Sequence, residues 1–355
     1  MNGERSTPLP PRRNPRLFGH GEPLARMRRA MDRGRMPHAW LLRGPRGVGK
    51  ATLAWHIARE LLAEPGQRRM CHHPDSPLFR QVAQGAHPEL YLLEKGIARG
   101  AERRSGEIAV DDVRALLERL QTTASLPGYR VVMVEEADRL NRNAANALLK
   151  MLEEPPPRMV FLLVTQTPAA LPATIVSRCA QLALHPLEEA LVVEALEELA
   201  DLPAEEARRF AALAGGCIGR AIELAESGFL EAYGTVLNTL ADAASAGDVL
   251  PAVRVLRAYG GDRGGVRGFA LLGEIVRRAV RLEAGMPPAI ELVARERARL
   301  AALTARHRLD RLAALWDKLQ AFARRGEWLH LESSQALIVM LDELAGGPDR
   351  GGGGR

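Results

Sequence analysis

The residues between positions 44 and 51 have the types and spacing of a phosphate-binding loop. They read GPRGVGKA, which fits the pattern G-x-x-x-x-G-K directly after an apolar run. In such a loop, backbone N–H groups and the N-terminus of the next helix surround a phosphate, and Lys50 reaches its outer oxygens. The next position should carry a hydroxyl for Mg²⁺, but here it is Ala51. We therefore expect a site for ATP and Mg²⁺, or a descendant of one, with an impaired metal side. Its candidate residues are Gly44, Gly47, Gly49, Lys50, Ala51 and Thr52.

Two acids, Glu135 and Glu136, follow a second apolar run at 130–134. In P-loop enzymes the first acid after such a strand holds the metal, and the second orients an attacking water. Glu135 is one methylene longer than the usual Asp, and Glu136 fits the catalytic base. The same two residues would also be found if the acids only made the end of a strand soluble and had no catalytic role. The preceding glycine-rich loop is what favours the functional interpretation.

Two arginines are further candidates. Arg178 lies in the tripeptide Ser-Arg-Cys, after the apolar run at 159–165. Arg220 follows a glycine-rich segment and would lie in the first turn of a helix, where the helix dipole disfavours a cation. That position suggests contact with an anion. A solvated surface arginine is the alternative in both cases.

A zinc site at Cys71-His72-His73 is not expected. A structural zinc site needs four ligands at short spacings, and no second cysteine pair lies nearby. We expect no metal bound by this segment.

The elements that must position these residues alternate between strands and helices over residues 38–185, which predicts a doubly wound α/β domain. Strands are expected at 39–42, 89–94, 130–134, 159–165 and 180–184. Helices are expected at 23–33, 52–63, 143–154 and 171–179, with another that begins near Asp111. Residues 64–88 read as a polar insertion, and residues 97–106 as a charged loop.

After residue 186 the pattern changes to helices alone. The predicted helices are 188–199, 204–214, 218–226, 229–245, 251–259, 265–284, 290–305, 308–324 and 333–344. The predicted division is a flexible basic arm at 1–16, the α/β domain at 17–185, a helical lid at 186–227, a helical bundle at 228–345 and a flexible tail at 346–355.

The composition is that of an ordinary globular protein, with 355 residues, a net charge of +6 and a pI near 9.6. This charge agrees with proximity to nucleic acid, but an arginine-rich chain reaches the same pI without a binding surface. Three widely spaced cysteines argue against a disulfide framework. The start lacks the apolar core of a signal peptide, and no apolar run could span a bilayer. We expect a cytoplasmic protein without a membrane partner.

With these residues in order, the chain resembles the clamp-loader branch of the AAA+ superfamily, which includes subunits of the bacterial DNA polymerase III clamp loader. The likeness is dense over residues 17–226 and only architectural over the C-terminal bundle. The matching segments are HAWLLRGPRGVGKATLA, HPEL, IAVDDVRALLERL, GYRVVMVEEADRLNRNAANALLKMLEEPP, the segment 165–179 that ends in SRC, and the glycine-rich start of the helix at Arg220.

The resemblance implies a role for each candidate residue. Lys50 falls on the Walker A lysine, and Glu135 and Glu136 fall on the Walker B acids, with Glu136 as a vestigial base. Arg178 falls on the arginine that such subunits present in trans to nucleotide bound by the neighbouring subunit. Arg220 falls on the sensor arginine of the lid.

The resemblance also implies an architecture and partners. The expected architecture is a RecA-like AAA+ domain, a small helical lid and an all-α collar. The partners would be gamma or tau and delta subunits in a hetero-pentamer that loads a sliding clamp onto primed DNA.

Two departures from the ATPase subunits of that complex affect the choice of role. Gamma and tau are expected to keep the hydroxyl after the Walker lysine and four zinc cysteines, whereas this chain has Ala51 and only Cys71. This favours a subunit with little or no ATPase activity that completes its neighbour's site. The alternatives are a competent gamma-like or tau-like motor, and a scaffold that binds nucleotide without turnover.

Overall fold

The chain divides into two compact units. The first, called here the α/β unit, comprises Met1–Ala207 and Leu213–Ile222, and the second, the helical unit, comprises Arg208–Ala212 and Glu223–Arg355. Among the described helices, none is both long enough and apolar enough to cross a membrane. The predicted tail and all but the last residue of the predicted charged loop lie outside the described residues. The computed structural model describes residues 9–93, 106–120, 126–246, 249–260, 266–305, 307–325 and 332–345.

A five-stranded parallel sheet forms the core of the α/β unit, with the strand order β2-β3-β4-β1-β5. The strands are β1 (Ala39–Arg43), β2 (Leu90–Leu92), β3 (Arg130–Val134), β4 (Met159–Thr165) and β5 (Ala180–Ala183). Strands β3 and β4 are buried along their whole length, and this is why they read as continuous apolar runs. Parallel strands end at one edge of the sheet, so the segments after β1 and β3 come close together there.

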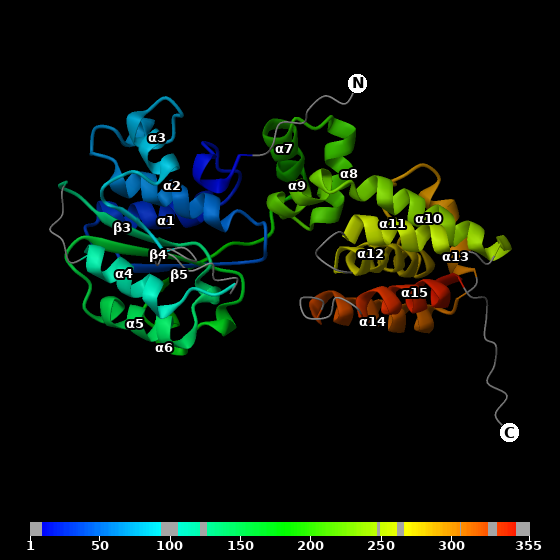
Figure 1. The fold of residues 1–355 in the computed structure, drawn as a ribbon. Helices are drawn as coiled ribbons and strands as arrows, with labels where there is room; N and C mark the ends of the chain where they lie inside the picture. Colours follow the sequence, from blue (N-terminus) through cyan, green and yellow to red (C-terminus); the bar gives the residue numbers. More distant parts are fainter. Residues whose placement is uncertain are drawn as a thin grey trace. The chain divides into compact units, whose positions relative to one another are not determined.

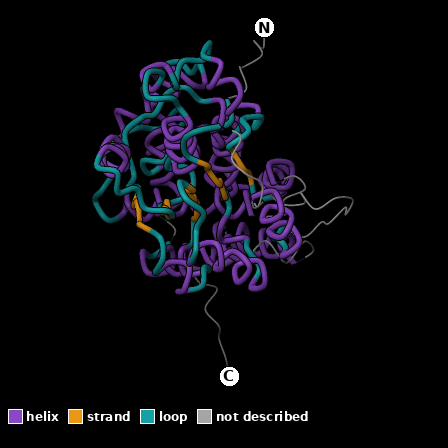
Figure 2. The backbone as a smooth tube through the Cα atoms, turned by 90° about the vertical axis from the view of Figure 1, so that its left-hand side faces the viewer, coloured by secondary structure: helices purple, strands orange, loops and turns teal. Residues whose placement is uncertain are grey.

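Helices cover both faces of the sheet (Figure 1), and the strands drawn in orange in Figure 2 have helices on both sides. Trp40 and Leu42 of β1 pack into one core with Leu53 of α2, while Leu41 packs into the other core with Leu148 of α5. Neighbouring residues divide between the cores because side chains alternate along a strand. The first face carries α1 (Gly21–Asp32), α2 (Lys50–Leu62) and α3 (Pro77–Gln84), and the second α4 (Val110–Leu120), α5 (Arg142–Glu153) and α6 (Ala173–Val176).

The polar insertion predicted at 64–88 is wrong in part, because it contains α3. Ser76 caps the N-terminus of this helix, and its hydroxyl accepts a hydrogen bond from the Phe79 N–H at 3.0 Å. Leu78 and Val82, one turn apart, are buried in the core on the α2 side of the sheet. Flanking histidines and prolines hide this short apolar stripe in the sequence.

The flexible arm predicted at 1–16 also differs over its described part. Asn14 is buried, and the fully buried Arg59 of α2 donates hydrogen bonds of 3.1 Å to the carbonyl oxygens of Arg12 and Asn14. A guanidinium inside the fold must find acceptors, and this backbone supplies them. Residues 12–14 are therefore held against α2.

In the described part of the chain, three helices follow β5, and six more make up most of the helical unit. The first three are α7 (Glu189–Ala200), α8 (Ala204–Ala214) and α9 (Ile218–Glu226). The six are α10 (Phe229–Ala246), α11 (Leu250–Gly260), α12 (Val266–Glu283), α13 (Glu296–Thr304), α14 (Leu309–Arg325) and α15 (Glu332–Ala345). Helices α12 and α14 pack along each other, with Phe269 stacked on Phe322 at 5.3 Å between ring centroids.

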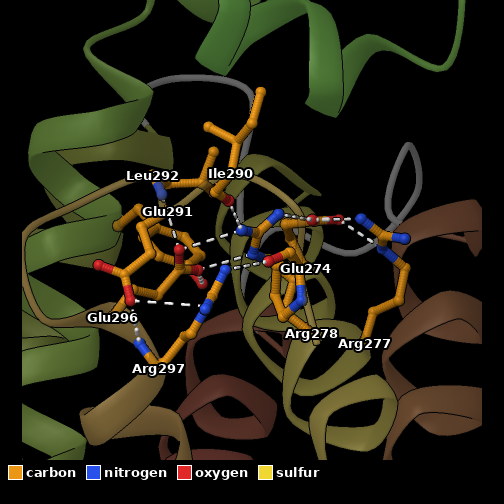
Figure 3. Close-up of polar contacts among 10 residues, drawn as sticks. Glu274, Arg277, Arg278, Ile290, Glu291, Leu292, Glu296 and Arg297 are labelled. Carbon is orange, nitrogen blue, oxygen red and sulfur yellow. Dashed lines mark hydrogen bonds and ion pairs between the residues drawn. The ribbon is translucent and has the colours of Figure 1, made fainter. Parts of the chain in front are cut away.

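A buried carboxylate lies at the start of α13 (Figure 3). Glu296 is fully buried and accepts hydrogen bonds from the Tyr233 hydroxyl at 2.6 Å, Arg278 Nε at 2.6 Å and the Leu292 N–H at 2.7 Å. Burial, together with Glu296, raises the pKa of Tyr233 well above its ordinary value, so the hydroxyl remains a donor. The helix predicted over 290–305 starts late because the Leu292 N–H turns to this side chain.

Candidate functional site

The glycine-rich loop connects β1 to α2 and is fixed at its tip. Gly47 and Gly49 have φ values of +78° and +108°, where a residue with a Cβ would be strained. Val48 between them is fully buried, and its carbonyl oxygen lies 2.7 Å from His20 Nε2. Burial lowers the pKa of His20, which favours a neutral ring that donates this hydrogen bond. The loop is thus held by the segment that opens α1.

Lys50 is engaged by the loop itself. Its ammonium donates hydrogen bonds to the carbonyl oxygens of Gly44 at 2.8 Å and Pro45 at 2.7 Å, and the residue is only 6% exposed. Burial lowers the pKa of Lys50, and the charge of Asp138 opposes that shift. Two of its three N–H donors are therefore engaged by the loop, and a phosphate would have to use the third or displace a carbonyl oxygen.

The metal side of the site does not fit Mg²⁺. Ala51 offers no oxygen, and Thr52 is half-buried in the first turn of α2. Glu135 accepts a hydrogen bond from the indole N–H of Trp55 on α2, so one oxygen of the acid expected to hold a metal is engaged in joining α2 to the end of β3. Glu136 is half-buried beside it. We derive no catalytic step through a nucleotide at this loop.

The start of α9 docks on the glycine-rich loop. The Gly219 N–H donates to the Gly47 carbonyl oxygen at 2.8 Å. A Cβ on Gly47 would lie 2.6 Å from the backbone nitrogen of Arg220, and one on Gly219 would lie 2.9 Å from Gly47 Cα. The two glycines therefore permit this close approach. Arg220 lies in the first turn of α9, as predicted, and its side chain is exposed. Its role as a sensor of bound anion stays a prediction.

Arg178 lies apart from this loop, just after α6. Its Nη2 is 2.7 Å from an oxygen of Glu153, the last residue of α5, and its Nη1 donates to the Thr174 carbonyl oxygen at 3.0 Å. The side chain is 36% exposed. Helix α6 spans four residues, against the nine predicted, because Pro172 precedes it and the chain turns into β5 soon after. Among the described residues, no contact joins Arg178 to the glycine-rich loop.

Three residues of the site were not singled out from the sequence. Trp55 reads as an ordinary core residue, and its link to Glu135 depends on the tertiary structure. Asp138 is the third acid after β3, and it accepts a hydrogen bond from the Gln166 N–H at 3.3 Å. The acidic run EEAD at 135–138 could have identified Asp138 from the sequence. Gly219 stood beside the predicted sensor arginine.

Residues around Cys71 form a polar cluster without metal geometry. His72 Nε2 lies 3.1 Å from Glu60, and Arg28 pairs with both Glu60 oxygens at 2.8 and 2.5 Å. The His56 and His72 rings stack at 4.3 Å between centroids. Over the described part of the chain, no three His, Cys, Asp or Glu side chains are grouped so as to hold a metal ion. Ion pairing and stacking stabilise this segment.

The cluster predicts acid sensitivity of the α/β unit. Burial, with smaller effects from His72 and Arg59, lowers the pKa of His56 to about 3. The unfolded chain then binds more protons than the folded one below about pH 6.5, so stability falls as the pH falls through that window. The pKa of Glu60 is lowered to about 2, because hydrogen bonds from Arg28 and His72 outweigh the raising effect of burial. Its contribution is lost only below about pH 4.5.

Between pH 6.5 and 4.5, His56→Phe should therefore flatten the pH dependence of the unfolding free energy. The slope that it removes corresponds to about 2–3 kcal/mol over this window. Urea denaturation of the α/β unit at a series of pH values measures the slope. The exposed His73→Phe serves as the control and should leave it unchanged. An equal slope in wild type and His56→Phe would contradict the prediction.

In sequence, the chain is similar to subunits of bacterial DNA polymerase III. Residues 19–188 match the family model described as DNA polymerase III, delta subunit. DNA polymerase III subunit delta' of Pseudomonas aeruginosa is 41% identical over 186 residues, 52% of this chain and 54% of that protein. Subunit delta' of Escherichia coli is 34% identical over 61% of this chain and 62% of that protein. Subunit tau of Salmonella typhimurium is 29% identical over 94% of this chain and 51% of that protein. The chain thus spans about half to three-fifths of the length of these relatives.

The parallel sheet, the glycine-rich loop after its strand β1 and the helices on both faces define the α/β fold of a P-loop protein, and the C-terminal part of the chain is all-helical where it is described. Within that class the chain resembles the delta-prime subunit of bacterial DNA polymerase III, in agreement with the clamp-loader resemblance that its motifs indicated.

Proposed function

We propose that this chain is a clamp-loader subunit of the delta-prime type, which helps to load a sliding clamp onto primed DNA during replication. The family model that matches residues 19–188 and the similarity to delta-prime relatives support this proposal. Its partners would be gamma or tau and delta subunits in a hetero-pentamer in the cytoplasm. The lid at 186–227 would connect the AAA+ domain to a collar at 228–345 that holds the complex together.

The observation that carries the proposal is the contrast between Lys50 and Arg178. Lys50 is buried and bound to its own loop, next to a position without a hydroxyl. Arg178 is partly exposed, with its guanidinium beside solvent. A cation that must reach a phosphate on another subunit needs such exposure, whereas a catalytic P-loop lysine must reach a phosphate in its own loop. The chain would thus act on its neighbour's nucleotide.

A competent motor subunit is the second candidate function. The tau relative aligns over 94% of this chain, more than either delta-prime relative. The absence of a hydroxyl at Ala51 and the Trp55–Glu135 hydrogen bond favour the delta-prime role instead.

The isolated chain should hydrolyse ATP no faster than a buffer blank, and Lys50→Ala should leave this rate unchanged. Within a reconstituted complex, Lys50→Ala should also preserve the DNA-stimulated ATPase rate, because turnover occurs on other subunits. Ala51→Ser restores the hydroxyl but should not create turnover, since Glu135 remains bound to Trp55. Steady-state phosphate release measures all three. Robust hydrolysis by the isolated chain that Lys50→Ala abolishes would refute the delta-prime role and favour the motor.

A further inference from the structure

The carboxylate at the end of α5 has no part in the function proposed so far. Glu153 is the last residue of that helix, where the helix dipole disfavours an anion. Its partner is Arg178, at 2.7 Å, and both side chains are partly exposed, at 49% and 36%. An ion pair this exposed adds little to stability. Its position beside the proposed trans arginine is therefore the feature to explain.

We infer that Glu153 is a positioning residue that holds the Arg178 guanidinium in the orientation from which it reaches a phosphoryl group on the neighbouring subunit. This inference rests on the function proposed above. Arginine is a long side chain with several freely rotating bonds, and a free one must be ordered each time it acts. A carboxylate that fixes it beforehand removes that entropic cost from the step in which charge develops.

The geometry leaves Arg178 able to act while it is held. The Thr174 carbonyl oxygen accepts from Nη1 and Glu153 pairs with Nη2, so two fixed acceptors define the guanidinium plane. A guanidinium has five N–H donors. The remaining N–H groups of Arg178 can donate to a phosphoryl group of the neighbouring subunit while Glu153 stays bound. The partial exposure of the Arg178 side chain permits this.

Glu154 provides a matched control on the same helix end. It is the next residue, equally acidic and exposed, and it caps α5 through its backbone N–H to the Lys150 carbonyl oxygen. In the described structure its side chain makes no contact with Arg178. A general effect of negative charge near the helix end would affect both positions, whereas positioning requires Glu153 alone.

The test uses the reconstituted complex and measures single-turnover, DNA-stimulated ATP hydrolysis over a range of ATP concentrations. At the site that this chain completes, Glu153→Gln should lower the maximal single-turnover rate by about three- to tenfold with little change in the ATP concentration that gives half of that rate, because orientation and not ground-state binding is lost. Glu153→Asp should lie between wild type and Glu153→Gln, and Glu154→Gln should match wild type. Size-exclusion chromatography checks that each variant assembles.

A double variant separates positioning from other roles. In an Arg178→Ala background, Glu153→Gln should have no further effect, because the residue that it orients is gone. Two results would overturn the inference while the proposed function stands. One is a further decrease in the rate when Glu153→Gln is added to Arg178→Ala. The other is a wild-type rate for Glu153→Gln when Arg178→Ala alone has a lowered rate. A wild-type rate for Arg178→Ala itself would instead refute the proposed function.

Discussion

Arg178→Ala is expected to cut ATP turnover at the one site that this chain completes, while the complex still assembles. A trans arginine stabilises charge that develops on the transferred phosphoryl group, and its removal costs about a thousandfold or more at a single site. Because the other sites of a hetero-pentamer would keep their own arginines, the decrease in the total rate will be smaller. Single-turnover hydrolysis resolves the affected site.

Two further variants test whether the geometry of the Arg178 side chain, and not only its charge, is required. Arg178→Lys keeps the positive charge but loses the planar fork that can bind an oxyanion and Glu153 together, so it should stay well below wild type. Arg80 is an exposed arginine on α3, on the opposite face of the sheet, and Arg80→Ala should match wild type. A full rate for Arg178→Ala would show that the arginine was assigned the wrong role.

Glu296→Ala is expected to cause the largest loss of stability of any single substitution considered for this chain. The change removes the carboxylate that accepts from Tyr233, Arg278 and the Leu292 N–H (Figure 3). Arg278, only 4% exposed, is left as a buried cation that retains the Ile290 carbonyl oxygen and a 4.0 Å approach to Glu274. Removing one partner of a buried pair typically costs about 3–5 kcal/mol.

The loss should be confined to the helical unit. Hydrogen exchange in α12 and α13 measures it locally, and those amides should lose protection in Glu296→Ala while the β3 and β4 amides keep theirs. Glu283, exposed at the end of α12, supplies the control, since Glu283→Gln should leave exchange unchanged. Equal protection of α12 in Glu296→Ala and wild type would mean that the network contributes little.

The sequence indicated the residues of the candidate site but not their contact partners. The loop from Gly44 to Ala51 and the acids after β3 were readable because each follows a buried strand at fixed spacing, and the structure places them at the same edge of the sheet. The partners of these residues were not readable. Trp55 binds Glu135 from another element, and Gly219 meets Gly47 across a large part of the chain.

The sequence by itself indicated the five strands, the helices other than α3, the change to an all-helical pattern after residue 186, and the positions of the candidate residues. These follow from periodicity and turn chemistry, which act over a few neighbouring residues. Only the tertiary structure decided that Lys50 is turned onto its own loop, that α9 docks on that loop, and that Arg178 lies beside Glu153. Each of these is a contact whose geometry depends on how the segments pack, and local sequence patterns carry no record of it.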